Sequence, residues 1–162
     1  MNVRQMQGLH YLEFTLGGKQ FALPLSVVDR VVHAVEVMRL PKGPDIVCGL
    51  INYKGQIIPI INISRRFHLP ERTLDPDQYF IIMHSNVRKF GLLADNIHSV
   101  TDRNPDLIIS PTDIMAGVEF LSGIIKLPDG LMLIPDLDKL LTHDEDVALK
   151  KVMPNETRDA TH

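Results

Sequence analysis

The sequence has few of the residues from which metal centres and disulfides are built. Its 162 residues include a single cysteine, Cys48, so an internal disulfide and a cysteine metal cluster are both excluded. The seven histidines are scattered, and no two of them form the His-x-x-x-His pair that places two metal ligands on one helical face. We therefore expect no bound metal and no cofactor.

The chain also lacks long apolar runs and a large excess of charge of one sign. No stretch approaches about 18 consecutive apolar residues, and residues 1–8 lack the apolar core of a signal peptide. We therefore expect a cytoplasmic protein without direct membrane insertion. The net charge is only −3, and the aromatic residues are three tyrosines and six phenylalanines. Nucleic-acid binding, which relies on clustered cations and stacking rings, is not expected.

Motifs of common enzymes are missing as well. The sequence contains no Gly-x-Ser-x-Gly elbow and no Gly-x-x-x-x-Gly-Lys phosphate-binding loop. The acidic residues near the C-terminus fit a helix N-terminus and a solvated helix face. We expect no catalytic residues, and the chain is not predicted to be an enzyme.

The clearest positive feature is the stretch at residues 49–67. It contains two apolar runs, the second dense in isoleucine, on either side of Gly55, a pattern that predicts a β-hairpin with a glycine turn. Pro59 lies in the second run and has no backbone N–H to donate. Its strand is therefore predicted to lie at a sheet edge or to carry a bulge there.

A second stretch, residues 123–141, repeats the order of the first. It again gives a glycine, an apolar pair, a turn with glycine, an apolar run, an Asn or Asp, and a short tail. In this comparison Gly49 matches Gly123, Asn62 matches Asp136, and Gly55 matches Gly130 with one inserted residue. The chain is therefore predicted to contain one motif twice.

The remaining segments predict further strands. Residues 9–16 alternate in polarity and are followed by Gly17-Gly18 and residues 20–24, which predicts another hairpin. Residues 26–32 have an apolar spacing that favours a short helix, residues 32–40 a weak strand, and residues 95–97 a short turn or helix. We predict strands at residues 79–84 and 90–94, a surface loop at residues 68–77, and a C-terminal helix within residues 136–152.

Together these elements predict an all-β fold of two small five-stranded barrels closed by a C-terminal helix. We expect a single domain at residues 9–143, with a first barrel at about 15–70 and a second at about 78–136. The N-terminal strand and the C-terminal segment can cross between the barrels. Residues 144–162 are predicted to hold the helix end and a frayed tail.

A few polar residues suggest surfaces rather than chemistry. Lys54 lies at the tip of the central hairpin with Tyr53 beside it, and Arg65 and Arg66 follow the second strand. These side chains are either ordinary solvated groups or part of a binding surface. Residue types alone leave both interpretations open.

The residues of the central hairpin carry a resemblance to a known family. Residues 49–63 read Gly-Leu-Ile-Asn-Tyr-Lys-Gly-Gln-Ile-Ile-Pro-Ile-Ile-Asn-Ile. They closely resemble the Gly-Val-Ile-Asn-Leu-Arg-Gly-x-Ile-Ile-Pro-Val-x-Asp-Leu motif of the CheW family of chemotaxis coupling proteins. The second copy resembles that family's closing hairpin and helix, so the resemblance covers about residues 9–141.

The resemblance implies a fold and a function that periodicity alone does not. It implies two SH3-like five-stranded barrels with an apolar groove between them, and a non-catalytic adaptor for chemotaxis or a related motility array. The implied partners are the cytoplasmic tip of a methyl-accepting chemoreceptor and the regulatory domain of a CheA-type histidine kinase. The implied location is cytoplasmic, at membrane receptor arrays through these partners.

The resemblance also implies three groups of site residues. The receptor-binding groove is expected to contain Val27, Val28, Val31, Leu93 and Val100. The hairpin motif is Asn52, Tyr53, Lys54 and Gly55, and the kinase-binding surface is expected at Val35, Val37, Met38 and Arg39.

Two residues depart from the family pattern. Lys54 stands where arginine is usual, and an ammonium cannot reproduce the bidentate contact of a guanidinium. Asn62 stands where aspartate is commoner. One alternative is therefore a specialised CheW-like protein that docks receptors without activating a kinase. An alternative of another class is an OB-like barrel that binds single-stranded nucleic acid.

Overall fold

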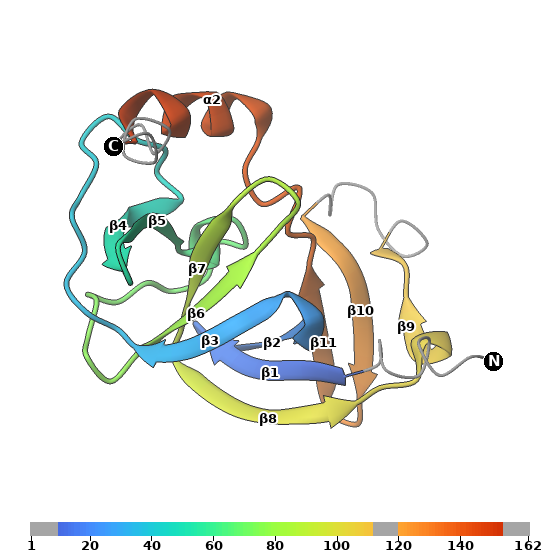
Figure 1. Cartoon of the computed structure of the whole chain (residues 1–162). Coiled ribbons are helices and arrows are strands. Elements are labelled where there is room, and N and C mark those ends of the chain that lie inside the picture. The colour runs from blue at the N-terminus through green and yellow to red at the C-terminus, as the bar shows by residue number, and fades with distance from the viewer. Residues whose placement is uncertain (1–9, 112–119, 154–162) are drawn as a thin grey trace.

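The computed structural model describes residues 10–111 and 120–153. Its strands form two sheets, one of six strands and one of five, and a C-terminal helix packs beside the five-stranded sheet (Figure 1). This arrangement confirms the predicted all-β class and the C-terminal helix. The six-stranded sheet has the order β8-β1-β2-β11-β10-β9 and contains β1 (His10–Leu16), β2 (Lys19–Pro24), β8 (Asn96–Asp102), β9 (Ile108–Ile109), β10 (Leu121–Leu127) and β11 (Gly130–Pro135).

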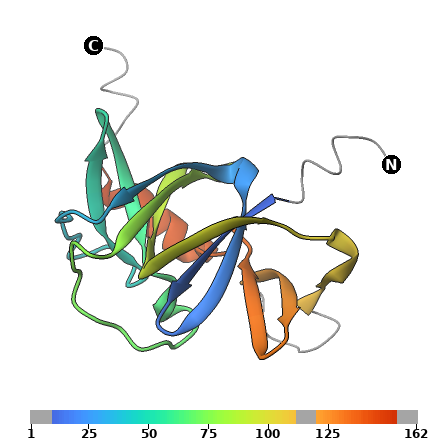
Figure 2. The same cartoon turned by 90° about the horizontal axis from the view of Figure 1, so that it is seen from below.

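The five-stranded sheet has the order β3-β6-β7-β5-β4. Its edge strands are therefore β3 and β4, at opposite sides of the sheet. In Figure 2, which views the molecule from below, β8 of the other sheet crosses the side that faces the viewer. The five strands are β3 (Val28–His33), β4 (Val47–Tyr53), β5 (Gln56–Ile61), β6 (Tyr79–His84) and β7 (Lys89–Ala94).

The two sheets exchange strands between the halves of the chain. The N-terminal hairpin β1–β2 pairs with β8 and β11, whereas the hairpin β6–β7 pairs with β3 and β5. This pairing differs from the predicted barrels at residues 15–70 and 78–136, which placed β6 and β7 in the second barrel. Local alternation predicts where strands lie, but it contains no information on which half of the chain supplies each partner.

The N-terminal hairpin forms as predicted. Gly17 and Gly18 both have positive φ, 59° and 80°, the backbone that a two-residue turn of this type requires and that glycine adopts without strain. The side chains of Leu12, Phe14 and Leu16 then point to one face of β1 and are buried. They belong to a core cluster that also contains residues of β4, β5, β6 and β7, so the two sheets share this core.

The central hairpin β4–β5 also forms as predicted, but β5 is an interior strand rather than the edge strand that Pro59 suggested. Pro59 lies opposite Leu50, whose N–H and C=O both bond to the backbone of Met38, at 2.8 and 2.9 Å. The Leu50–Pro59 pair is therefore a non-hydrogen-bonded pair. The missing N–H of Pro59 costs nothing on the β4 side, and the parallel pairing with β7 begins one residue later, at Ile60.

The predicted repeat is present in the backbone. Both hairpins have a register shift at the same place, between Val47 and Gly49 in β4 and between Leu121 and Gly123 in β10. Each hairpin closes with a two-residue turn, because Tyr53 lies opposite Gln56 and Leu127 lies opposite Gly130. The expected one-residue insertion is therefore wrong: Gly130 corresponds to Gln56, and Gly55 corresponds to Asp129.

The prediction of a short helix at residues 26–32 is wrong for residues 28–32, which form a strand. Only Leu25–Val27 form a 3-10 turn, and the chain then continues as β3. Residues 32–40 form no extended strand beyond the end of β3 except for a single bridge between Met38 and Leu50. Residues 95–97 are likewise not a turn throughout, since β8 begins at Asn96.

The C-terminal helix α2 (His143–Val152) is shorter than the predicted span at residues 136–152. It starts at a capping box, in which the backbone N–H of Glu145 donates to Thr142 Oγ1 and the Thr142 N–H donates to the Glu145 carboxylate. Residues 144–153 of the predicted tail are thus mostly helix. Residues 154–162, predicted to fray, lie outside the described residues.

Candidate functional site

Strand β3 carries a bulge that brings two valines to one face. Val28 lies opposite Met83 and Val31 lies opposite Ile81, but Arg30 lies opposite Ile82, so Asp29 is the extra residue. Met83 and Ile81 are two residues apart on β6 and therefore share a face. Val28 and Val31 share that face with them, and both valines pack against the core common to the two sheets.

Strand β8 carries a matching bulge at the edge of the other sheet. Val100 lies opposite Leu12 and Ile97 lies opposite Phe14, so two residues of β8 face the single residue Glu13. Leu12 and Phe14 belong to the shared core, and Ile97 packs against it. Val100 is 50% exposed. We call Val28, Val31, Ile97 and Val100 the edge-strand surface.

The predicted groove residues lie on different elements: Val28 and Val31 share one face of β3, and Val100 lies on β8, at the edge of the other sheet. Val28, Val31 and Val100 belong to the edge-strand surface, and Val27 lies next to it in the 3-10 turn, half-buried against the shared core. Leu93 does not join them: it lies opposite Phe80, on the other face of β7, and is buried. It lines a cavity of about 200 Å³ with Leu16 and Gly17. Sequence reasoning missed Ile97, because it fell in the predicted turn at residues 95–97.

The hairpin motif forms a tight turn at the far end of the five-stranded sheet. The N–H of Gly55 donates to Asn52 Oδ1 at 2.8 Å, and Lys54 and Gly55 have φ of 53° and 86°. The Lys54 ammonium lies 5.4 Å from the centroid of the Tyr53 ring, within the range of a cation–π contact. The turn therefore holds these side chains in a defined, exposed arrangement.

Three of the four predicted kinase-binding residues are exposed on a strap beside β4, whereas the fourth, Val37, is half-buried against the shared core. Val35 and Met38 are 55% and 58% exposed, and Arg39 is exposed as well. The strap is fixed to β4 by the Met38–Leu50 bridge and by close approach to Gly49, where a Cβ atom would lie 2.5 Å from the Met38 carbonyl oxygen. We call residues 35–39 the β4 strap. It shares strand β4 with the hairpin tip, whereas the edge-strand surface includes β3, at the opposite edge of the sheet.

The arginines after the central hairpin have structural partners. Arg66 donates to the carbonyl oxygen of Leu140 at 2.9 and 3.2 Å and pairs with Glu145, so it attaches α2 to the sheet. Its guanidinium also lies 4.7 Å from the centroid of the Phe120 ring. Arg65 Nε donates to Glu71 at 2.7 Å. Both arginines therefore make internal contacts, which neither interpretation of these residues, solvated groups or a binding surface, had predicted.

Asn62 has a structural role that explains part of its departure from the family pattern. Its Oδ1 accepts from the Ser64 N–H at 3.0 Å, and its Nδ2 donates to Glu71 at 3.2 Å. Asp136, its counterpart in the repeat, accepts from the Asp138 N–H at 3.1 Å in the same manner. Only the amide can also serve the Glu71 carboxylate as a donor.

Within residues 10–111 and 120–153 no group of three or more His, Cys, Asp or Glu side chains is placed to hold a metal ion. Burial raises the pKa of the Cys48 thiol, which disfavours the reactive thiolate. Over the same ranges, no helix is long and apolar enough to cross a membrane.

Comparison with known proteins identifies the fold and the family. The model of the CheW-like domain matches residues 10–145. The chemotaxis protein CheW of Treponema pallidum is 30% identical over 138 residues, which are 82% of this chain and 81% of that protein. CheW of Klebsiella aerogenes is 25% identical over 140 residues, covering 85% and 84% of the two chains.

A solved structure agrees with these sequence matches. The scaffolding protein TtCheW from Thermoanaerobacter tengcongensis aligns with a TM-score of 0.76 at 28% identity, covering 85% of this chain and 95% of that one. The predicted fold of two β subdomains with a C-terminal helix is therefore confirmed. The hairpin motif, the two sheets and these sequence and structure matches together show that the chain belongs to the CheW-like domain family.

Proposed function

We propose that this protein is a non-catalytic adaptor that couples chemoreceptors to a CheA-type histidine kinase in bacterial chemotaxis or a related motility array. The observation that carries the proposal is the presence of two separate apolar surfaces on a fold shared with a scaffolding protein: the half-buried to exposed edge-strand surface and the exposed valine and methionine of the β4 strap. The edge-strand surface and the β4 strap involve opposite edge strands of the five-stranded sheet. An adaptor needs this separation, because its two partners must bind at the same time.

The edge-strand surface is assigned to the cytoplasmic tip of a methyl-accepting chemoreceptor. Its side chains are Val28, Val31, Ile97 and Val100, with Val27 adjacent, all aliphatic. An amphipathic helical hairpin can lay one apolar face on such a surface. Leu93 is buried on the other face of β7 and is left out of this surface.

The β4 strap and the hairpin tip are assigned to the regulatory domain of the kinase. Val35 and Met38 supply exposed apolar area, and the exposed charged residues are Glu36 and Arg39 of the strap and Lys54 of the hairpin tip. Several weak contacts of this kind reinforce one another when the partners are held in one array, since the effective concentration is high. Through these partners the protein is placed in the cytoplasm at receptor arrays.

Calorimetric titration of two variants separates the assignments. Val31→Asp introduces a charge on the edge-strand surface and is expected to weaken binding to a receptor tip fragment at least tenfold, about 1.4 kcal/mol. The same variant keeps its affinity for the kinase regulatory domain. Met38→Asp is expected to show the reverse pattern, and it serves as the matched control. If both folded variants kept full affinity for both fragments, the assignments would be wrong.

Lys54 favours a second candidate, a specialised adaptor that docks receptors with weakened kinase coupling. A point-like ammonium in place of a guanidinium loses bidentate contact with a carboxylate. Lys54→Arg is then expected to strengthen binding to the kinase domain. Wild-type binding to the receptor alone would support the specialised role, and binding to both would support a working coupling protein.

A further inference from the structure

The edge-strand surface depends on the bulge in β3. In a straight strand, alternate residues share a face, so Val28 would lie beside Arg30, or Val31 beside Asp29. The extra residue removes this conflict, because it leaves Val28 and Val31 opposite Met83 and Ile81 on one face. The bulge therefore keeps both charged side chains off the apolar surface.

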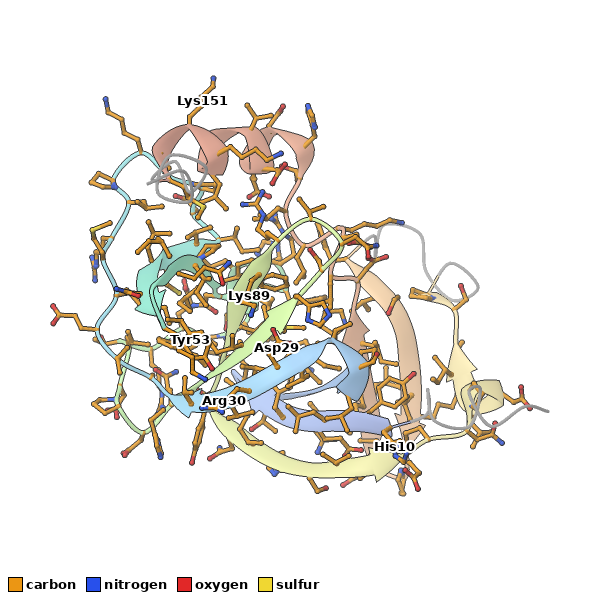
Figure 3. The ribbon with its side chains drawn as sticks, in the orientation of Figure 1. His10, Asp29, Arg30, Tyr53, Lys89 and Lys151 are labelled. Carbon is orange, nitrogen blue, oxygen red and sulfur yellow. The ribbon has the colours of Figure 1, made fainter. Side chains whose placement is uncertain are left out.

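The side chain of the bulged residue is tied to the neighbouring hairpin. Asp29 Oδ1 lies 3.0 Å from His84 Nδ1, and Oδ2 lies 3.4 Å from Lys89 Nζ. His84 and Lys89 are directly opposite each other at the end of β6–β7. From the edge strand β3, Asp29 therefore contacts side chains of both β6 and β7. Figure 3 labels Asp29 and Lys89, which lie near each other in that view.

The second bulge has a similar contact, which is an independent observation. Glu13 lies opposite the two residues of β8 that form the bulge, and its side chain is only 12% exposed. Arg103 Nη2 donates to its carboxylate at 2.7 Å, and the Thr101 hydroxyl donates to it as well. A carboxylate is therefore held at each bulge: that of the bulged residue Asp29 by side chains of β6 and β7, and that of Glu13, on the strand opposite the bulge, by Thr101 of β8 and by Arg103 just after it.

We propose that Asp29 is a positioning residue for the edge-strand surface. Its carboxylate, bound to His84 and Lys89, stabilises the bulged form of β3 over a straight strand and so keeps Val28 and Val31 on the receptor-facing side. Asp29 itself does not contact the receptor. The role of the surface rests on the proposed function, but the effect of Asp29 on the bulge is a property of the free protein.

The first measurement needs no partner. In NMR spectra of the free wild-type protein, cross-strand contacts are expected between Val28 and Met83 and between Val31 and Ile81. In Asp29→Ala these contacts weaken and contacts of a shifted register appear, because the charge-assisted bonds are lost. Lys89→Met is expected to cause part of the same change, whereas Lys89→Arg, which keeps the cation, preserves the wild-type pattern. Lys89→Met also serves in place of Asp29→Ala if that variant does not fold.

The second measurement is calorimetry of the same variants with a chemoreceptor tip fragment and with a kinase regulatory domain. Asp29→Ala is expected to lower receptor affinity about tenfold and to leave kinase affinity unchanged. Glu36→Ala removes an exposed carboxylate from the β4 strap and is the control for loss of charge; it keeps receptor affinity.

The outcomes are distinguishable. Unchanged cross-strand contacts in Asp29→Ala would overturn the proposal. A loss of affinity without any change in the bulge would also overturn it, since Asp29 would then contact the receptor directly. If wild-type protein bound no receptor tip, the proposed function would fail and with it the functional role of Asp29, while the spectra would still show whether Asp29 holds the bulge.

Discussion

Asn62 is 5% exposed, and its side-chain amide bonds to two neighbours, one a hydrogen-bond donor and the other an acceptor. The oxygen accepts from the Ser64 N–H, which caps the 3-10 turn Ile63–Arg65, and the nitrogen donates to Glu71. Aspartate can perform the first task but not the second. Asparagine in place of the family's aspartate therefore allows a hydrogen bond to Glu71 in the loop after the 3-10 turn.

We predict that Asn62→Asp lowers the free energy of unfolding by about 1–3 kcal/mol at pH 7. The change removes a donor and places a second carboxylate beside Glu71. Urea unfolding measures the difference. Asp136→Asn at the equivalent position keeps the accepting oxygen and is expected to cost less; equal effects at the two positions would contradict the role given to Glu71.

Lys54 is one of two non-glycine residues with positive φ among the described residues. Asparagine tolerates this backbone better than lysine and is preferred before glycine in such turns. We predict that Lys54→Asn raises the free energy of unfolding by about 0.5–1 kcal/mol. Lys19→Asn, in the strand after the other hairpin turn, is the control and is not expected to stabilise. A decrease in the urea midpoint of Lys54→Asn would show that the cation–π contact with Tyr53 matters more.

At the scale of elements, the hairpins were predictable because their signals are local. Alternating apolar residues and glycine turns specify β1–β2 and β4–β5 whatever surrounds them. Strand β3 was mistaken for a helix because its bulge lets residues three apart, Val28 and Val31, share a face, which imitates helical spacing. The same effect at β8 concealed Ile97. The turn at Asn52–Gly55 was therefore placed in the right element, while the bulged edge strand β3 and the start of β8 were assigned to the wrong kind of element.

Helix α2 is attached to the rest of the chain by side-chain contacts from Arg66 and Arg88. The Arg66 side chain is 16% exposed and makes three kinds of contact, whereas its neighbour Arg65 is 39% exposed and pairs mainly with Glu71. Hydrogen bonds to charged groups that are shielded from water contribute more than those at the surface.

We predict that Arg66→Ala lowers the free energy of unfolding by about 2–3 kcal/mol and speeds hydrogen exchange at the amides of α2. Arg65→Ala is the matched control, with an expected cost of about 1 kcal/mol or less. A double mutant with Glu145→Ala should cost less than the two single changes added together, because the two residues share one interaction. Additive effects would show that the ion pair contributes nothing.

At the scale of the whole molecule, the exchange of strands joins the two halves of the chain. The six-stranded sheet takes β1–β2 from the first half of the chain and its other four strands from the second, and the five-stranded sheet takes β6–β7 from the second half and its other three strands from the first. No local pattern could have predicted this exchange, because either partner would satisfy the alternation equally well. The sheets also share one core cluster.

We therefore predict that fragments 1–70 and 71–162 do not fold separately. Each should give poorly dispersed NMR spectra and no cooperative thermal transition, since each contains hairpins without their partner strands. Mixing the two fragments is expected to restore the native spectrum in part. A cooperative transition in either isolated fragment would show that the exchange is not required for folding.

The exchange also affects folding during synthesis. The hairpin β1–β2 emerges from the ribosome well before the parallel partner of β2, strand β11, which begins only at Gly130. At about 5–20 residues per second, on the order of ten seconds pass between the two. During this interval the apolar face and the unpaired edges of β1–β2 stay open to other chains, so a nascent protein of this family is most exposed to aggregation and to chaperone binding through its N-terminal hairpin.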